Sequence, residues 1–221
     1  MTPSMNVVFT DIWSATPKDP DILFSYADAS FTTPAPTPAA CVTQWTAQCR
    51  IVINYTQHIQ PLWDKPRVTI DPMTMAVISD HTCSRAGCHN TVDAAAAAMV
   101  PGGQLDLQAV ASDEEPLQLR SYRELFFSDN EQELVGGALQ DVPGPLDQNG
   151  NPTPGPTVGP YLDAGSARGG RSAAFLSRFA TGSGSTHAGY LSPAELRLLS
   201  EWLDIGAQYF NNPFDPAVPV N

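Results

Sequence analysis

The pattern of apolar and polar residues is most regular close to the C-terminal end of the chain. From position 192 onward, apolar side chains recur every three or four residues, which places them on one face of a helix. The segment opens with Ser-Pro-Ala-Glu, in which Ser192 and Glu195 form a capping box around a proline at the first helical position. The residues of the apolar face are Leu196, Leu199, Trp202, Leu203 and Ala207. We therefore predict an amphipathic helix that packs on the core.

The rest of the pattern predicts short elements joined by loops, and hence a fold class that is mainly α with many loops. Helical spacing or strong helix formers mark the predicted helices, partial alternation marks the strands, and Pro and Gly mark the longest loop. The predicted helices cover 56–63, the five alanines at 94–98, 117–127 and 172–180. The predicted strands cover 6–13, 51–55 and 104–108, and the predicted loops 71–82 and 141–170.

Two regions of the chain differ in composition. Residues 1–50 contain the predicted strand 6–13 and the stretch FTTPAPTPAA at 31–40, which is typical of a linker or an extended surface segment. We expect 1–50 to be a β or extended N-terminal arm, or the remnant of a preceding β-rich domain. A single domain over 51–221 follows, since 221 residues suffice for one domain and an extension.

The charge of the chain excludes one class of partner. Lys and Arg number 11 and Asp and Glu number 23, so the formal net charge is −12. Nucleic acid is not an expected partner, because phosphate binding needs clustered basic residues. No apolar run approaches the length of a membrane span.

One motif carries most of the predicted chemistry. Cys83 and Cys88 are followed at once by His89, and two cysteines with a histidine directly after the second are the arrangement that attaches a c-type haem. Each thiol adds to one haem vinyl group, and the adjacent histidine binds the iron. The usual spacing is C-x-x-C-H, whereas this chain has two further residues between the cysteines. We predict one haem c at this motif.

The alternatives for the motif are a disulfide or a zinc site. His81, Cys83, Cys88 and His89 offer four ligands of the type that zinc prefers. Adjacent Cys88 and His89 have difficulty reaching one tetrahedral ion together, so haem is favoured. A zinc-stabilised interaction module stays the third hypothesis for the whole protein.

The two remaining cysteines bear on the compartment. Once the motif uses its pair, Cys41 and Cys49 are left to each other, and we expect a disulfide between them, which requires an oxidising compartment. Haem c attachment in bacteria also takes place outside the cytoplasmic membrane. We expect a periplasmic or extracellular bacterial protein, attached to a membrane complex only through partners. The N-terminal sequence lacks the pattern of a signal peptide, so the chain is expected to be mature or cut from a longer one.

Several segments together resemble a known family. The order of helix, haem motif, irregular loops and a final helix ending in Trp-Leu-Asp-Ile-Gly-Ala resembles that of class I cytochromes c. The combination is more narrowly similar to the C-terminal haem domain of hydrazine synthase alpha-subunit-like secreted bacterial proteins, across residues 50–215. The segments that carry it are 53–63, 104–107, 165–171 and 187–214, with the haem motif. The longer motif and the absence of a second one depart from that family, so hydrazine synthesis is not implied.

The resemblance implies where the second iron ligand lies. In class I cytochromes c it belongs to the loop that enters the last helix, and the related domain uses two histidines. His187 occupies that loop and is the expected distal ligand, with His89 on the other side. Met99 and His58 are the alternatives, although a packing role is the simpler explanation for both. His81 lies on the attachment side, from which it cannot easily reach the distal face.

Arg168 and Arg171 lie in a Gly-rich turn and are candidate partners for the haem propionates, because arginine suits carboxylates. Two solvated surface charges are an equally good explanation.

The leading hypothesis is therefore electron transfer by one bis-histidine haem, in a subunit or domain of a larger extracytoplasmic redox assembly. Its expected partners are redox proteins, such as other cytochromes or subunits of that assembly, which an acidic surface would steer if they are basic. The second hypothesis is a haem redox enzyme of nitrogen or peroxide chemistry with an open distal site.

Overall fold

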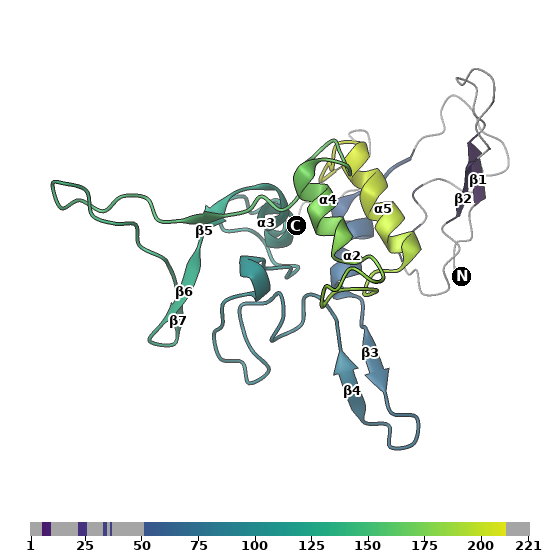
Figure 1. Ribbon diagram of the computed structural model, residues 1–221, viewed down its shortest axis with the longest axis horizontal. Helices are drawn as coiled ribbons and strands as arrows, with labels where there is room; N and C mark the ends of the chain where they lie inside the picture. The colour runs from purple at the N-terminus through teal and green to yellow at the C-terminus, as the bar shows by residue number, and fades with distance from the viewer. Residues whose placement is uncertain (1–5, 10–21, 26–32, 35, 37–50, 211–221) are drawn as a thin grey trace.

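The computed structural model describes residues 6–9, 22–25, 33–34, 36 and 51–210 (Figure 1). A π-helical turn, η1 (Tyr55–Ile59), runs directly into the first α-helix, and a 3-10 turn, η2 (Gly102–Gln104), follows the cysteine motif. The α-helices of this part of the chain are α2 (Gln60–Asp64), α3 (Arg120–Phe126), α4 (Gly170–Ser177) and α5 (Pro193–Asp204). Long irregular segments connect them.

The strands form small antiparallel pairs and no larger sheet within the described residues. The pairs are β1 (Asn6–Phe9) with β2 (Ile22–Ser25), β3 (Val68–Ile70) with β4 (Val77–Asp80), β5 (Asp129–Asn130) with β8 (Thr157–Val158), and β6 (Gln132–Val135) with β7 (Ala138–Asp141). Figure 1 shows the β3–β4 and β6–β7 hairpins projecting away from the helices. Two of the four pairs are thus peripheral to the helical centre.

The predicted fold class is wrong. Helix accounts for 25% and strand for 15% of the structure, so the chain is not mainly α, and the expectation of a mainly α, class I cytochrome c-like domain fails with it. The difference arises mostly between the cysteine motif and α4, where hairpins and irregular segments take the place of helices.

The five alanines illustrate why one predicted helix is absent. The Asp93 carboxylate accepts hydrogen bonds from the N–H groups of Ala95 and Ala97, at 2.8 and 2.9 Å. Ala96 adopts a positive φ of 60°, and Val92 pairs with Ala98 across the turn. A helix of this length is unstable without tertiary support, and the side chain of Asp93 offers the backbone a turn in its place.

Three further predictions are also wrong. Residues 51–54 form no strand, and neither does 104–108, where Leu105 and Leu107 are nevertheless buried. The predicted loop 71–82 contains β4, which completes the hairpin with β3. Asp106 between them is buried as well, at 2% exposure, so the alternation in 104–108 does not correspond to two faces of a strand.

The other helices confirm the prediction from spacing. Residues 56–63 fall within η1 and α2, and Asn54 caps this unit by accepting the Thr56 N–H at 3.0 Å. The segments 117–127 and 172–180 correspond to α3 and α4. The predicted strand at 6–13 is present as β1, whereas the rest of it, and most of 1–50, lie outside the described residues.

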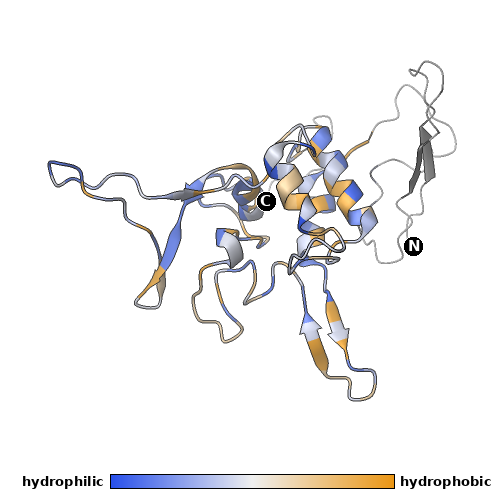
Figure 2. Cartoon of the chain, viewed as in Figure 1, coloured by the Kyte–Doolittle hydropathy of each residue, from blue (hydrophilic) through white to orange (hydrophobic). Residues whose placement is uncertain are grey.

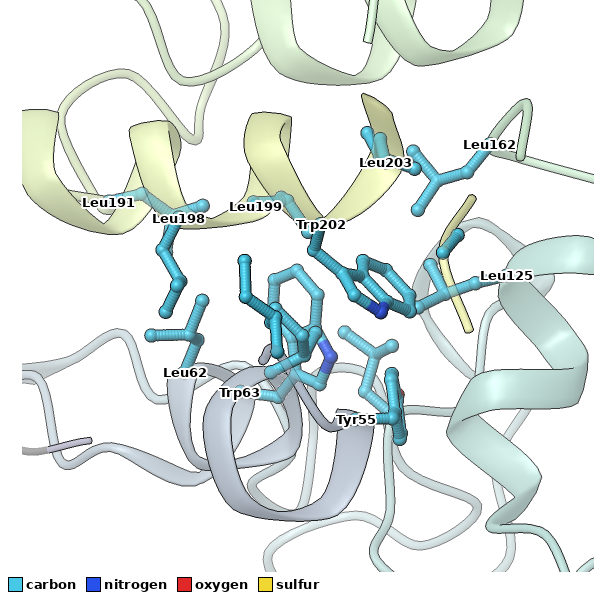
Figure 3. Close-up of a cluster of buried hydrophobic side chains, with 14 of the residues drawn as sticks. Tyr55, Leu62, Trp63, Leu125, Leu162, Leu191, Leu198, Leu199, Trp202 and Leu203 are labelled. Carbon is cyan, nitrogen blue, oxygen red and sulfur yellow. The ribbon is translucent and has the colours of Figure 1, made fainter. Parts of the chain in front are cut away.

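The core lies where α5 packs across η1 and α2 (Figure 3). Trp63 and Trp202 are fully buried there, each at 0% exposure. The Tyr55 ring lies 5.4 Å from that of Trp202, and its hydroxyl donates to Ser121 Oγ at 2.9 Å. Burial of such large rings is the dominant favourable contribution to a fold of this size.

The N-terminal end of α5 is fixed by a buried carboxylate. Glu195 is 0% exposed and completes the predicted capping box with Ser192. Its oxygens also accept from Lys65 Nζ at 2.7 Å and from Arg67 at 3.2 Å. Because Lys65 and Arg67 connect α2 to β3, these ion pairs hold the final helix against the segment that leads into the cysteine motif.

The hydropathy of the surface is uneven. Figure 2 shows apolar residues along the β3–β4 hairpin, where Ile70, Val77 and Ile78 are exposed. Met73 and Met75, at the tip of this hairpin, are 92% and 71% exposed. Neither methionine can therefore serve as a ligand inside the domain.

Candidate functional site

The cysteine motif forms a tight loop after β4. The Ser84 N–H donates to the carbonyl of Trp63 at 3.2 Å, and the Ser84 hydroxyl donates to Asp64 at 2.6 Å. The His89 N–H donates back to the Cys83 carbonyl at 3.1 Å. Gly87 has a φ of 82°, a conformation that L side chains rarely adopt. The longer spacing between the cysteines is thus absorbed by a closed turn that brings Cys83 and His89 together.

The segment after η2 supports the far side of this loop. The Gly102 N–H donates to the Cys88 carbonyl at 2.9 Å, and the Leu107 N–H donates to the His89 carbonyl at 3.0 Å. A Cβ atom at Gly102 would lie 3.4 Å from the Cys88 oxygen and 3.7 Å from the His89 ring. The backbone of 102–107 therefore packs directly on the Cys88–His89 dipeptide.

The orientation of His89 leaves one ring nitrogen available. Its Nδ1 lies 3.0 Å from the Leu105 carbonyl and donates to it, since a carbonyl can only accept. The free Nε2 is then unprotonated, which is the form that binds a metal. Burial lowers the pKa of His89 below its ordinary value of 6.5. The imidazole is accordingly neutral at pH 7 and competent as a ligand.

The structure places His187 opposite His89. The two ring centres are 5.8 Å apart, with an angle of 40° between the planes. Metal–imidazole bonds of about 2 Å on both sides of one ion would separate two ring centres by about 6 Å. Burial also lowers the pKa of His187, as does nearby Arg178. Two neutral imidazoles therefore face each other at a spacing that suits one metal ion between them.

A largely apolar cavity of about 110 Å³ lies at the two histidines. Its walls come from α2, the segment 102–107, α4 and the turn after α4. The residues that line it are Trp63, Cys83, His89, Gly102, Gly103, Leu105, Leu107, Tyr161, Phe175, Arg178, Phe179 and His187. Ligand pockets usually exceed about 300 Å³, so a macrocycle would extend out of this cavity or displace part of its wall.

Both cysteines of the motif are free thiols, Cys83 buried and Cys88 half-buried. Burial raises the pKa of Cys83 to about 11, so this thiol is protonated at neutral pH. Cys83 lines the cavity, and Cys88 holds the neighbouring position to His89. The disulfide alternative is therefore not what the structure contains at this motif.

The other candidate ligands lie elsewhere. His58 is a buried residue of η1, where its Nδ1 accepts the Asn54 N–H at 3.0 Å. Met99 is half-buried on the turn that replaces the alanine helix. His81 stacks on Tyr190, with 4.3 Å between ring centres. None of these three is among the described residues that line the cavity.

The two predicted propionate arginines are not brought to the cavity. Arg168 is exposed, and Arg171 is exposed and paired with Asp163 at 3.1 Å. The cavity wall contains Arg178 and Tyr161 instead, which the sequence analysis missed. The spacing of Phe175, Arg178 and Phe179 was the available signal, because it places all three on one face of a helix continued by a turn.

The zinc alternative finds no support in the geometry. The described residues contain no group of three or more His, Cys, Asp or Glu side chains placed to hold a metal ion. His81 lies against Tyr190 rather than beside the cysteines. The predicted pair Cys41 and Cys49 lies outside the described residues, so its disulfide stays a prediction.

A second, larger hollow of about 530 Å³ lies beside α3 and is strongly charged. Its arginines are engaged by acidic neighbours: Arg120 pairs with Asp113 at 2.8 Å, and Arg123 pairs with Glu114. Burial, followed by the neighbouring acidic groups, raises the pKa of Glu124 to about 8. No cysteine or histidine lines it, whereas Cys83, His89 and His187 all line the smaller cavity.

No protein-family model, curated protein or solved structure significantly matches this chain. None of the helices in the described part of the chain combines the length and apolar character required to cross a membrane.

Proposed function

We propose that this chain carries one covalently attached c-type haem and transfers single electrons, with His89 and His187 as the two axial ligands. The observation that supports this most directly is the 5.8 Å separation of the two imidazoles at a mostly apolar cavity. A second supporting observation is that both motif cysteines are free thiols, with Cys88 directly before His89 and Cys83 in the cavity wall. On this proposal the domain belongs with the secreted bacterial haem proteins that its motifs resemble.

The residues present fit a haem in their chemistry. Cys83 and Cys88 would hold it by thioether bonds: each S–H adds across a vinyl C=C, the sulfur bonds to one carbon and the hydrogen goes to the other. This addition needs no oxidant or reductant. The bound haem would supply one-electron redox chemistry at its iron.

The chain's own groups define the remaining properties. The Leu105 carbonyl fixes the His89 ring and its tautomer. Apolar walls such as Phe175 and Phe179 keep water away from the ligands. Two histidine ligands leave no open coordination position, which favours an electron carrier over a catalyst. They also favour a lower potential than a His/Met pair would give.

Arg178 and Tyr161 take over the role first considered for Arg168 and Arg171. Both line the cavity, and the Tyr161 hydroxyl already donates to the Gly103 carbonyl at 2.6 Å. A guanidinium at the cavity wall suits a propionate.

Because the cavity is small, entry of the macrocycle would require the His187 loop to move outward.

The compartment and partners follow from the same proposal. Covalent haem attachment places the protein in the periplasm or outside the cell, as part of a larger redox assembly. The net charge of −12 would attract a basic redox partner at long range.

The test is a visible spectrum of the full-length protein matured with haem c, recorded oxidised, dithionite-reduced and under carbon monoxide. We expect sharp α and β bands that carbon monoxide does not shift, and a denaturation-resistant mass increase of one haem. Cys83→Ala should leave a single thioether, and His187→Ala should produce a high-spin, carbon monoxide-binding form. Absence of a Soret band would overturn the proposal.

One observation favours the second candidate, a haem redox enzyme with an open distal site. A separate open hollow of about 460 Å³ lies on the polar side of His187, lined by Arg178 and hydroxyl side chains. If His187 withdraws toward it, the iron is open and the imidazole becomes an acid–base group. A high-spin native spectrum that shifts with carbon monoxide would favour this function over electron transfer.

A further inference from the structure

The backbone of the loop that carries His187 is held by short-range hydrogen bonds of its own. The His187 N–H donates to Ser185 Oγ at 3.1 Å, and the Tyr190 N–H donates to the His187 carbonyl at 3.1 Å. The Gly189 N–H donates to the Phe179 carbonyl at 2.9 Å, which fixes the base of the loop to the turn after α4. The direction of the imidazole depends in addition on ring contacts, one of them with Phe179 at 6.0 Å between ring centres.

A pair of stacked rings meets this loop from the other side of the site. His81 and Tyr190 lie 4.3 Å apart with 24° between their planes. The Tyr190 ring also contacts the His187 ring edge to face, at 5.7 Å and 63°. A row of rings thus runs from His81 through Tyr190 to His187.

The outer end of this row is well anchored. His81 directly follows β4, and its N–H donates to the Arg67 carbonyl at 3.0 Å. Arg67 is itself held by the buried Glu195. Two residues after His81 comes Cys83, so one end of the row is tied to the loop that presents His89. The stack thus links the two sides of the site through side chains, in addition to the contact between the His89 and His187 rings themselves.

We propose that the His81–Tyr190 stack is a positioning clamp that keeps His187 opposite His89 and so sets whether the distal position is closed. The inference rests on the proposed function and assigns a role to two residues that do not line the cavity. An aromatic stack of this kind contributes roughly a 2- to 12-fold bias to an equilibrium. The clamp therefore adjusts the population of the closed site without being essential for folding.

The first readout uses the haem-loaded full-length protein. Tyr190→Ala and His81→Ala should each raise the fraction that binds carbon monoxide by roughly 2- to 12-fold over native protein. Tyr190→Phe and His81→Phe keep a ring at each position and should restore the native behaviour. The double alanine variant should behave like Tyr190→Ala alone, since that substitution already removes the stack together with the contact to His187.

The second readout needs no haem. In the full-length chain prepared without haem attachment, cross-relaxation between the ring protons of His89 and His187 should be seen by NMR. Tyr190→Ala should weaken it and Tyr190→Phe should retain it. Phe127→Ala, which removes an exposed ring at the end of α3, is the matched control and should change neither readout.

The outcomes separate the two proposals. Native behaviour of both alanine variants in both readouts would overturn the clamp. A different result is weaker cross-relaxation in Tyr190→Ala combined with a native protein that takes up no haem under maturation conditions. This result would support the clamp and refute the proposed haem function. If the phenylalanine variants also bind more carbon monoxide than native protein, the positioning role of the stack is refuted. The effect would then come from the Tyr190 hydroxyl and the His81 ring nitrogens, which those variants lack.

Discussion

The core beneath α5 and the cavity at His89 are built from the same kinds of side chain but are packed differently. In the core, Tyr55 and Trp202 are fully buried and contact each other ring to ring (Figure 3). At the cavity, Phe175 and Phe179 leave a hollow between themselves and two imidazoles. Trp63 belongs to both regions. The core is close-packed, as protein interiors are, whereas the region around the two imidazoles is hollow; the haem of the proposed function would bind there.

Removal of a core ring should have the largest effect on stability. We expect Trp202→Ala to lower the free energy of unfolding by about 3–5 kcal/mol, because it leaves a cavity and removes the bond from its indole N–H to the Gln208 carbonyl. Urea denaturation of the full-length chain measures this. Phe127→Ala, at an exposed ring, should cost less than about 1 kcal/mol, and equal costs for both would contradict the assignment of the core.

The ion pairs that hold α5 should come next. Glu195→Gln removes the charge that Lys65 and Arg67 share while keeping the shape of the side chain. We expect a loss of about 2–3 kcal/mol, since hydrogen bonds to charged groups are lost within a buried site. Glu133→Gln, on the exposed face of β6, is the control and should have little effect. A loss as small as that of the control would show that the buried carboxylate does not anchor the helix.

Glu124, which lines the charged hollow beside α3, should make the stability of the protein depend on pH. The pKa of Glu124 is about 8 when folded, above its ordinary value of 4.5. Glu124 therefore binds its proton more tightly in the folded state than in the unfolded state. Its contribution to the free energy of unfolding is complete below about pH 4.5 and is lost as the pH rises through about 8. Glu124→Gln should remove at least about 1 kcal/mol of this decline. The measurement is the melting temperature of native protein and Glu124→Gln at pH 5 and pH 9. If the fall in melting temperature between the two pH values is the same for both proteins, Glu124 is not buried as described.

His187, the proposed distal ligand, should have the smallest effect on stability and, on the proposed function, a large effect on carbon monoxide binding. His187→Ala should change the free energy of unfolding of the haem-free chain by less than about 1 kcal/mol, because the side chain is partly exposed on a Gly-rich loop. The same substitution should open the haem-loaded protein to carbon monoxide. If instead it unfolds the chain, His187 is a core residue and the contrast between the two regions disappears.

Some of this architecture could be predicted from the sequence because the signals were local. The spacing of Leu199, Trp202 and Leu203, with the Ser192–Glu195 capping box, predicted α5, and the same short-range logic predicted α3 and α4. The run of alanines at 94–98 led to a wrong prediction of helix. Over so few residues, helix propensity stabilises the backbone less than the hydrogen bonds of the turn that Asp93 accepts. The fold class prediction failed because short hairpins such as β3–β4 and β6–β7, which the apolar pattern did not reveal, and the distant pair β5–β8 replace helix between the core elements.

The candidate site divides in the same way. The motif formed by Cys83, Cys88 and His89 is contiguous and could be found by reading the chain. His187 was expected only through a resemblance, and the tertiary structure is what places it 5.8 Å from His89. The arginines were misassigned because proximity in sequence to a Gly-rich turn says nothing about which wall a side chain reaches. Arg178 lines the cavity because the turn that follows α4 forms part of the cavity wall.

The local sequence pattern therefore accounts for elements whose stabilising contacts lie within a few residues of one another, above all the capped final helix. Which side chains share a cavity depends on how separate elements pack, so it follows from the three-dimensional structure alone. The pairing of two histidines 98 positions apart in number (187 − 89) and the stack of His81 on Tyr190 are of this second kind. No local pattern encodes either of them; they exist because α5 packs across α2 and carries the His187 loop to the cysteine motif.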